Sequence, residues 1–280
     1  MLKFRERYTT ESSLYNKLKQ IRYPLKQAYV KDIPLNIYQT WHTTELPEQM
    51  AKCINQIRRE NPEFNYCLSS DAECRAFIAT NYEADVLNAF DRLIPGAYKA
   101  DLWRYCVLYK QGGIYLDIKY QPMNGFRFIT LTEKEHLVLD RDKTGIYNAL
   151  MVCRPGNALL LRAIHQIVKN VESRYYGTNP LDPTGPGLLA KLITMDERRM
   201  MVDMKHLVFF DDFNYRTILY KNFMIFHSYN GYLGEHDSNK KVGYYLDLWR
   251  RKQIYYSSAN VKPNFSVLSR HPYLNLRISI

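Results

Sequence analysis

The sequence predicts an α/β protein in which helices flank a mixed sheet, and two observations carry that prediction. Up to residue 118, short apolar runs alternate with segments whose apolar residues recur every three or four positions, as in α/β folds. Beyond residue 120, three strand-like runs follow one another before the next helix-like segment. Because strands alternate with helices in one part and succeed one another in the next, the sheet is predicted to be mixed.

The first half of the chain contains predicted strands and helices with recognisable ends. Pro47 suits the first turn of one helix, and Ser70 or Asp71 can cap another. Gly112 and Gly113 stop the helix that precedes them. The predicted strands are 33–41, 64–68 and 114–118, and the predicted helices are 46–60, 71–81, 84–93 and 97–111.

The second half is predicted to add short strands, two helices and one irregular loop. Residues 177–187, rich in Gly and Pro, are predicted to form a loop packed over another part of the protein. Residues 1–32 carry charge with weak periodicity, so we predict an N-terminal helical appendage followed by one domain over 33–280. The other predicted elements are strands 126–129, 136–139, 147–153, 207–210 and 223–227, a helix at 158–174 and a helix from residue 188.

The charge of the chain favours an anionic ligand. Lys and Arg number 39 against 28 Asp and Glu, a net charge of +11, and 46% of the residues are hydrophobic. The basic residues are dispersed rather than concentrated in a stripe, so no nucleic-acid partner is predicted. A basic nucleic-acid binder with 24 tyrosines stays as a third alternative.

The cellular compartment is predicted from cysteines and apolar runs. Five scattered cysteines without paired spacing favour a reducing compartment. No apolar run reaches the length of a signal-peptide core or a membrane span. These observations predict a cytoplasmic protein without a transmembrane segment.

The segment DLWRYCVLYKQGGIYLDIKY, residues 101–120, concentrates the candidate site residues. Asp101 and Arg104 lie three apart on one helix face, and Asp117 and Lys119 end the following strand on one face. Ligands of α/β sheets bind beyond the carboxyl ends of strands, where a carboxylate can hold a cation on a diphosphate and a lysine can neutralise phosphate. From residue types alone, exposed ion pairs explain both pairs about as well.

Trp41 ends the first predicted strand in the same layer. A tryptophan at that place can stack on a nucleotide base. A tryptophan considered alone is more often part of the core.

Several segments in a fixed order resemble glycosyltransferase family 32, the retaining sugar transferases related to yeast initiating mannosyltransferases. They are IPLNIYQTW, LP, NPEFNY, KADLWRYCVLYKQGGIYLDIKY, TGPG and HSY, and they span about residues 33–230. The clostridial glucosylating toxins are similar in the central segment. The resemblance implies a GT-A fold, a Rossmann-like mixed sheet flanked by helices, which binds a nucleotide sugar at the switch point of the sheet.

The resemblance implies roles for residues in the first half of the chain. Trp41 is expected to stack on the base of the donor, and Asp101 and Arg104 are expected to hold the donor sugar or its ribose. Asp117 is expected to face the metal and the diphosphate.

Residues of the second half match the family more loosely. The resemblance places Asn148 near the donor sugar and gives Gly185 a close backbone approach. His227 and Ser228 are expected to close over the diphosphate, and Tyr229 stands where the family often has tryptophan.

Lys119 departs from the family motif Asp-x-Asp, which has a second carboxylate at this position. The resemblance implies a divalent cofactor, Mn²⁺ or Mg²⁺, for which Asp117 is the carboxylate that is left. Alternatively, Lys119 replaces the ion electrostatically, or catalysis is lost while binding is retained. The predicted catalytic residues are Asp101, Arg104, Asp117 and Lys119.

The resemblance predicts a glycosyltransferase that moves a hexose from a UDP- or GDP-sugar to a hydroxyl of a glycan, protein or lipid. Retention of anomeric configuration follows from the family alone. The alternative is a catalytically silent protein that binds a nucleotide sugar or a glycan.

Overall fold

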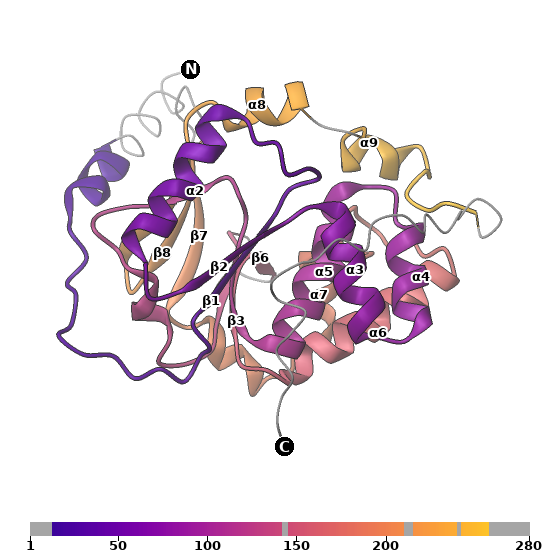
Figure 1. Cartoon of the computed structure of the whole chain (residues 1–280), viewed down its shortest axis with the longest axis horizontal. Helices are drawn as coiled ribbons and strands as arrows, with labels where there is room; N and C mark the ends of the chain where they lie inside the picture. The colour runs from indigo at the N-terminus through magenta and orange to yellow at the C-terminus, as the bar shows by residue number, and fades with distance from the viewer. Residues whose placement is uncertain (1–12, 142–144, 210–214, 240–241, 258–280) are drawn as a thin grey trace.

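A nine-stranded mixed sheet forms the centre of the computed structural model, which describes residues 13–141, 145–209, 215–239 and 242–257 (Figure 1). Its strands are β1 (Asn36–Thr40), β2 (Asn65–Ser69), β3 (Gly113–Leu116), β4 (Tyr120–Pro122), β5 (His136–Leu139), β6 (Ile146–Cys153), β7 (Met204–Phe209), β8 (Tyr215–Tyr220) and β9 (Phe223–Ser228). They are ordered β2-β1-β3-β6-β5-β7-β8-β9-β4. Strand β1 runs parallel to β2 and β3, and β5 runs parallel to β7, whereas the other neighbouring pairs are antiparallel.

Helices cover both faces of the sheet. They are α2 (Glu48–Glu60), α3 (Asp71–Asn81), α4 (Ala84–Arg92), α5 (Gly96–Gln111), α6 (Ala158–Glu172), α7 (Pro186–Leu192), α8 (Tyr232–Asn239) and α9 (Tyr245–Arg250), with 3-10 turns η1 (Phe128–Leu131) and η2 (Glu197–Met201). Helices α3 to α7 gather on one side of the sheet, and α2 lies on the other (Figure 1). Because side chains alternate along a strand, Tyr38 and Tyr115 enter the core beneath α3 to α7, while Ile37 and Ile114 enter the core beneath α2. The predicted α/β class, a mixed sheet flanked by helices, is confirmed.

The sheet curls, because β3 and β4 are consecutive in the chain but lie far apart in the strand order. Residues 117–120 form a tight turn between them, closed by a 3.1 Å hydrogen bond from the Tyr120 N–H to the Asp117 carbonyl. Strand β4 then pairs with β9, with Tyr120 opposite Ser228. The curl thereby brings β9 and its neighbour β8 beside the end of β3.

Most predicted elements occur within a few residues of their predicted ends. Ser70 caps α3 as expected, since its hydroxyl accepts the Glu73 N–H while the Glu73 carboxylate accepts the Ser70 N–H at 2.7 Å. The predicted strand at 126–129 is wrong, because these residues lead into η1. The apolar character of Phe126 and Phe128 reflects their burial in the core beneath α2 rather than strand pairing. Strands β4 and β8 and helices α8 and α9 were not predicted.

Some predictions concern the ends of the described ranges. Residues 13–20 are helical, whereas residues 1–12 of the predicted N-terminal appendage, and residue 210 of a predicted strand, lie outside the described residues. The division of the chain at residue 32 stays a prediction. In the parts of the chain that the structure describes, we find no helix with the length and apolar character that a membrane span needs.

His136 in β5 makes the stability of the fold depend on pH. Its ring is 1% exposed, and neither ring nitrogen has a hydrogen-bond partner within the described residues. Burial, with a smaller effect of Lys134, lowers the pKa of His136 from 6.5 to about 4. Between these values the unfolded chain binds a proton that the folded chain does not, so stability falls as the pH is lowered from 6.5 to 4.

We expect His136 alone to lower the free energy of unfolding by roughly 3 kcal/mol across this pH range. Denaturant unfolding of the wild type at several pH values between neutrality and pH 4 measures the slope, and His136→Phe is expected to flatten it. His165→Phe, at an exposed position of α6, is the matched control and is expected to keep the slope. A wild-type slope in His136→Phe would assign the pH dependence to other groups.

Candidate active site

Helix α5 carries Asp101 and Arg104 into the interior of the protein rather than to its surface. Nine of its residues are buried, and both charged residues are among them. Gly112 ends the helix with a φ of 62°, and a Cβ there would lie 2.5 Å from the Pro155 ring. The chain therefore reverses at once into β3, so the beginning of α5 and the end of β3 lie at the same end of the unit. This geometry is the reason why residues of α5 meet Asp117.

The Asp101 carboxylate is held in one orientation by three groups. The Asn148 amide donates to Oδ1 at 2.9 Å, the Thr184 hydroxyl donates to Oδ2 at 2.8 Å, and Arg104 Nη2 lies 3.4 Å from Oδ1. The Asn148 amide is held in turn by the Tyr105 hydroxyl at 2.8 Å. Burial raises the pKa of Asp101, although Arg104 and the two hydrogen bonds act against it.

Arg104 joins the two acids. Its Nη1 donates to Asp117 Oδ1 at 3.1 Å and to the Asn148 carbonyl at 2.8 Å. The guanidinium also lies 4.2 Å from the centre of the Tyr115 ring, a cation–π contact. Burial disfavours the charge, but Tyr115 and the two acids keep the pKa of Arg104 above its ordinary value.

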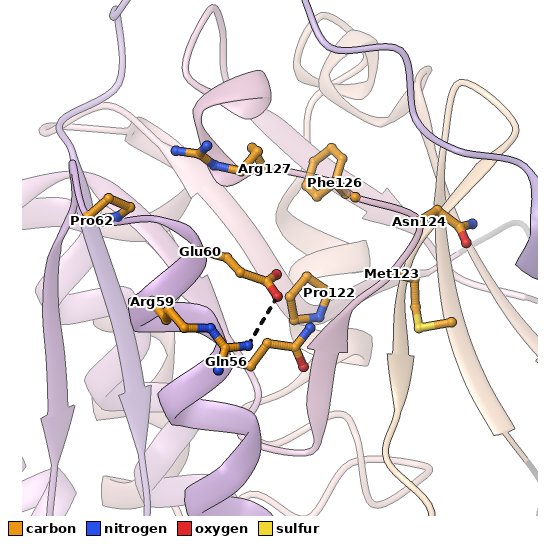
Figure 2. A pocket seen from close by; sticks show the side chains of 10 residues that line it. Gln56, Arg59, Glu60, Pro62, Pro122, Met123, Asn124, Phe126 and Arg127 are labelled. Atoms are coloured by element: carbon orange, nitrogen blue, oxygen red, sulfur yellow. Dashed lines mark ion pairs between the residues drawn. The ribbon is translucent and has the colours of Figure 1, made fainter.

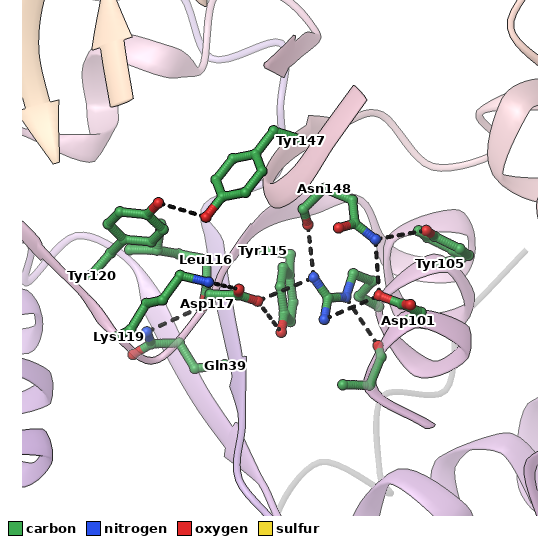
Figure 3. A network of polar contacts seen from close by, with 12 residues as sticks. Gln39, Asp101, Tyr105, Tyr115, Leu116, Asp117, Lys119, Tyr120, Tyr147 and Asn148 are labelled. Carbon is green, nitrogen blue, oxygen red and sulfur yellow. Dashed lines mark hydrogen bonds and ion pairs between the residues drawn. The ribbon is translucent and has the colours of Figure 1, made fainter. Parts of the chain in front are cut away.

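Asp117, directly after β3, is paired with two cations. Its Oδ1 accepts Arg104 Nη1 and the Tyr115 hydroxyl, the latter at 3.0 Å, and its Oδ2 accepts Lys119 Nζ at 2.5 Å (Figure 3). Burial raises the pKa of Asp117, but Lys119 and Arg104 outweigh this effect and hold it below the usual range. Burial lowers the pKa of Lys119, and Asp117 more than offsets that effect. Both side chains are therefore charged at neutral pH.

The contact between Lys119 and Asp117 does not arise as the sequence suggested. Strand alternation was expected to place both side chains on one face of a strand over 114–118, but β3 ends at Leu116. The turn over residues 117–120 brings Lys119 back onto the Asp117 carboxylate instead.

The Gly- and Pro-rich loop packs over Asp101. Besides the Thr184 hydroxyl bond, the Tyr105 hydroxyl donates to the Thr184 carbonyl at 3.0 Å. A Cβ on Gly185 would lie 3.1 Å from Asp101 Oδ2, so the backbone approaches this acid closely, and the predicted role of Gly185 toward the donor stays a prediction. Asp182, 1% exposed, organises the loop through the Thr178 N–H at 2.9 Å.

Three residues of this network were not among the predicted site residues. Tyr105 and Tyr115 occupy apolar positions of a helix and a strand, so their buried hydroxyls gave no separate signal in the sequence. Thr184 is part of the TGPG segment, and that motif was the one signal that could have identified it.

His227 and Ser228, the two predicted site residues in β9, point to opposite faces of that strand. Ser228 lies opposite Tyr120 of β4, and its hydroxyl accepts the Arg216 N–H at 3.1 Å. The neighbouring His227 side chain points to the other face, where it contacts the Gln121 side chain and, at 3.3 Å, the Tyr15 hydroxyl. The structure therefore brings Asn148 and Gly185 to Asp101, and it places Ser228 opposite Tyr120, next to Lys119 in the chain. It does not bring His227 to the Asp117 network.

Trp41 belongs to a separate apolar cluster in this structure. Its side chain is 8% exposed and packs with Ile118 and Tyr229 among others, and its ring centre lies 5.8 Å from that of His236 in α8. The indole N–H has no hydrogen-bond partner within the part of the chain that the structure describes. The Trp41 ring contacts the rings of His42 and His236 in this structure, and the predicted stacking on a base stays a prediction.

The residues around Asp117 do not fit a divalent ion. Hard cations need several oxygen ligands, and both Asp117 oxygens already accept cationic donors. An ion would have to displace Lys119 Nζ from Oδ2. Within the described residues, no group of three His, Cys, Asp or Glu side chains could hold a metal.

A separate hollow of about 410 Å³ lies between the end of α2 and the segment after β4 (Figure 2). Its residues are Gln56, Arg59, Glu60, Pro62, Pro122, Met123, Asn124, Gly125, Phe126 and Arg127. None of them is a predicted site residue. Its charged groups are paired, since Arg59 lies 3.7 Å from Glu60 and Arg127 lies 2.8 Å from Glu63.

The fold and the network together define an α/β protein with a buried cluster of paired charges at the carboxyl end of a central strand, the place where α/β proteins bind ligands. Residues 47–135, which include α2 to β4, match the family described as the glycosyltransferase sugar-binding region containing the DXD motif. This match and the mannosyltransferase relatives described next support a family 32-like glycosyltransferase, which confirms the resemblance predicted from the sequence.

The chain is similar to curated fungal mannosyltransferases over part of their length. It is 33% identical over 159 residues to inositol phosphoceramide mannosyltransferase 3 of Schizosaccharomyces pombe, covering 53% of this chain and 43% of that protein. It is 30% identical over 105 residues to the initiation-specific alpha-1,6-mannosyltransferase of Candida albicans, covering 35% of this chain and 27% of that protein. The match therefore spans less than half the length of either relative. A solved structure, PaToxG glycosyltransferase, aligns with a TM-score of 0.42 at 15% identity, covering 67% of this chain and 78% of that one.

Proposed function

We propose that this protein transfers a hexose from a UDP- or GDP-sugar to a hydroxyl acceptor, with retention of anomeric configuration. The observation that carries the proposal is the buried network of Asp101, Arg104 and Asp117 at the end of β3, inside the segment that matches the sugar-binding region. The named activities of the fungal relatives support mannose as the first sugar to test. The acceptor is a glycan, protein or lipid hydroxyl.

The chemistry of the network suits such a donor. Asp101 is an acceptor for sugar hydroxyls whose orientation is fixed by Asn148 and Thr184. Arg104 and Lys119 are permanent positive charges beside Asp117, where negative charge develops on a departing nucleoside diphosphate. In this proposal Asp101 orients the donor, and the two cations stabilise the leaving group.

The Asp101 role is tested by Asp101→Asn, which keeps the shape and one acceptor oxygen but removes the charge. We expect sugar transfer or donor hydrolysis to fall by about 100-fold or more, while the melting temperature shows a folded protein. The assay uses a panel of UDP- and GDP-sugars that includes GDP-mannose. Asp85→Asn, on an exposed position of α4, is the matched control and is expected to keep wild-type turnover.

The outcomes separate the assignment of one residue from the assignment of the function. Wild-type turnover in Asp101→Asn would remove Asp101 from the machinery. If Asp101→Asn, Asp117→Ala and Lys119→Ala all turned over donor like the wild type, the proposed active site would be wrong.

A second candidate function is donor binding without turnover, and one observation favours it. Lys119 lies at the position of the second carboxylate of the motif, 2.5 Å from Asp117 Oδ2. Calorimetry with the donor panel beside a hydrolysis assay distinguishes the two candidates. Binding with no turnover at high enzyme concentration would support the silent protein.

A further inference from the structure

Arg216, the second residue of β8, borders the Asp117 network although it lies far from it in sequence. Its backbone N–H donates to the Ser228 hydroxyl, and Ser228 lies opposite Tyr120 of β4. Neighbouring strands lie about 4.8 Å apart, so Arg216 is about 10 Å from Tyr120 across two strand spacings. Lys119 directly precedes Tyr120, so the curl of the sheet places Arg216 and Lys119 on the same side of the Asp117 network.

An aromatic wall lies in the same region. The Tyr147 ring stacks on His206 with ring centres 3.6 Å apart, and its hydroxyl lies 2.8 Å from the Tyr120 hydroxyl. Lys119 Nζ lies 5.2 Å from the centre of the Tyr120 ring and 5.6 Å from that of Tyr147. Burial lowers the pKa of His206, whereas Asp117 outweighs burial and raises the pKa of Lys119; the charge of Arg216 has a smaller, lowering effect on both groups, which is consistent with its place beside them.

Among the described residues, Arg216 is the cation of this region that has no carboxylate partner. Asp101 and Asp117 pair with Arg104 and Lys119, and Asp140 contacts His206 at 2.8 Å. The Arg216 side chain is exposed, and no carboxylate of the described residues pairs with its guanidinium. Two cations that repel each other across one region are stabilised together by a ligand that carries more than one negative charge.

We propose that Lys119 and Arg216 together bind the diphosphate of the donor and that donor binding needs no divalent ion. The proposal rests on the proposed function, because it assumes a nucleoside diphosphate donor, and it adds a residue and a metal independence that the family motif does not supply. The positive charge that a metal ion bound to the motif would supply comes instead from Lys119 and Arg216.

The chemistry of the two side chains suits this division of work. Arginine presents two parallel N–H donors that match two phosphate oxygens, and lysine acts as a compact point charge. Lys119 is held on Asp117 Oδ2 and remains charged, so it takes the place of an ion on that carboxylate. Arg216 is exposed and can turn toward a second phosphate.

Calorimetry of UDP and GDP binding tests the proposal, with UMP and GMP as ligands that lack the second phosphate. All titrations are run with EDTA and again with Mg²⁺ or Mn²⁺. We expect the wild type to bind one of the diphosphates equally well with EDTA. Arg216→Gln is expected to weaken diphosphate binding about 10- to 100-fold and monophosphate binding much less. Arg216→Lys should recover part of the loss, and Arg199→Gln, at an exposed position of η2, should bind like the wild type.

Each contrary result points to a different error. Binding that appears only with Mg²⁺ or Mn²⁺ would overturn the metal independence and leave the proposed function intact. Equal diphosphate binding by Arg216→Gln and the wild type would overturn the role of Arg216. If the wild type bound none of these nucleotides or their sugars under either condition, both this inference and the proposed function would fall. Melting temperatures of the variants confirm that loss of binding is not loss of folding.

Discussion

Replacing Asp117 by alanine is expected to lower the free energy of unfolding by about 3 to 5 kcal/mol, because it leaves buried positive charge without its carboxylate. Arg104 would keep Asp101, at 3.4 Å, and the Asn148 carbonyl. Lys119 would lose its ion-pair partner while its side chain is only 9% exposed. The main cost therefore comes from a lysine that is buried without a counter-charge.

Denaturant unfolding of Asp117→Ala measures this effect, and two comparisons identify its cause. Asp117→Asn keeps the size of the side chain, so a similar loss of stability would show that charge rather than volume matters. Asp32→Ala removes an aspartate from an ion pair with Arg154 in which both side chains are about half exposed, and it is expected to cost less than about 1 kcal/mol.

The response of Asp117→Ala to pyrophosphate distinguishes the loss of a counter-charge from a simple packing defect. Inorganic pyrophosphate should raise the melting temperature of Asp117→Ala more than that of the wild type, because the anion replaces the missing carboxylate beside Arg104 and Lys119. A variant as stable as the wild type, or one indifferent to pyrophosphate, would contradict the picture of Asp117 as the counter-ion of both cations.

The parts of the fold that could be predicted are those set by neighbouring residues. The capping box at Ser70 and the glycine that ends α5 are signals within a few positions, and both produced the expected helix ends. The succession of α5 and β3 follows from the same kind of signal. This order predicts that Asp101, Arg104 and Asp117 lie near one another, because a helix and the strand that follows it run in opposite directions.

The parts that could not be predicted depend on contacts between distant segments. Thr184 reaches Asp101 across 83 positions, and no spacing in the sequence encodes that contact. Strand β4 has only three residues, and although the run YRTILY of β8 is rich in β-favouring residues, nothing in it says which strand it pairs with, so the curl of the sheet is not predicted. Without the curl, nothing in the sequence links Arg216 to Lys119, so Arg216 could not be predicted as a site residue.

Replacing Lys119 by aspartate is expected to make nucleoside diphosphate binding, which we propose needs no metal in the wild type, depend on a divalent ion. Lys119→Asp places a second carboxylate on the turn that now brings Lys119 Nζ to Asp117 Oδ2. In EDTA the two carboxylates would repel each other, so we expect a lower melting temperature and weak binding of nucleoside diphosphates. Two adjacent carboxylates supply the oxygen ligands that hard cations need, so Mn²⁺ or Mg²⁺ should restore both properties.

Thermal melting with EDTA and with increasing Mn²⁺ measures the conversion. At a metal concentration about 100 times the dissociation constant, the melting temperature of Lys119→Asp should rise by roughly 5 to 10 °C. The wild type should show no such rise, because Lys119 already occupies the carboxylate. Lys119→Gln, which removes the charge without adding a ligand, is the matched control and should not respond to metal either.

Calorimetry then connects the metal to the donor. In Lys119→Asp the affinity for UDP or GDP should depend on Mn²⁺, whereas in the wild type it should not. If Lys119→Asp bound diphosphates without metal as tightly as the wild type, the positive charge of Lys119 could not be the group that replaces the ion. If the wild type itself gained stability from Mn²⁺ as the variant does, the ion would have a place beside Lys119 that the geometry around Asp117 does not provide.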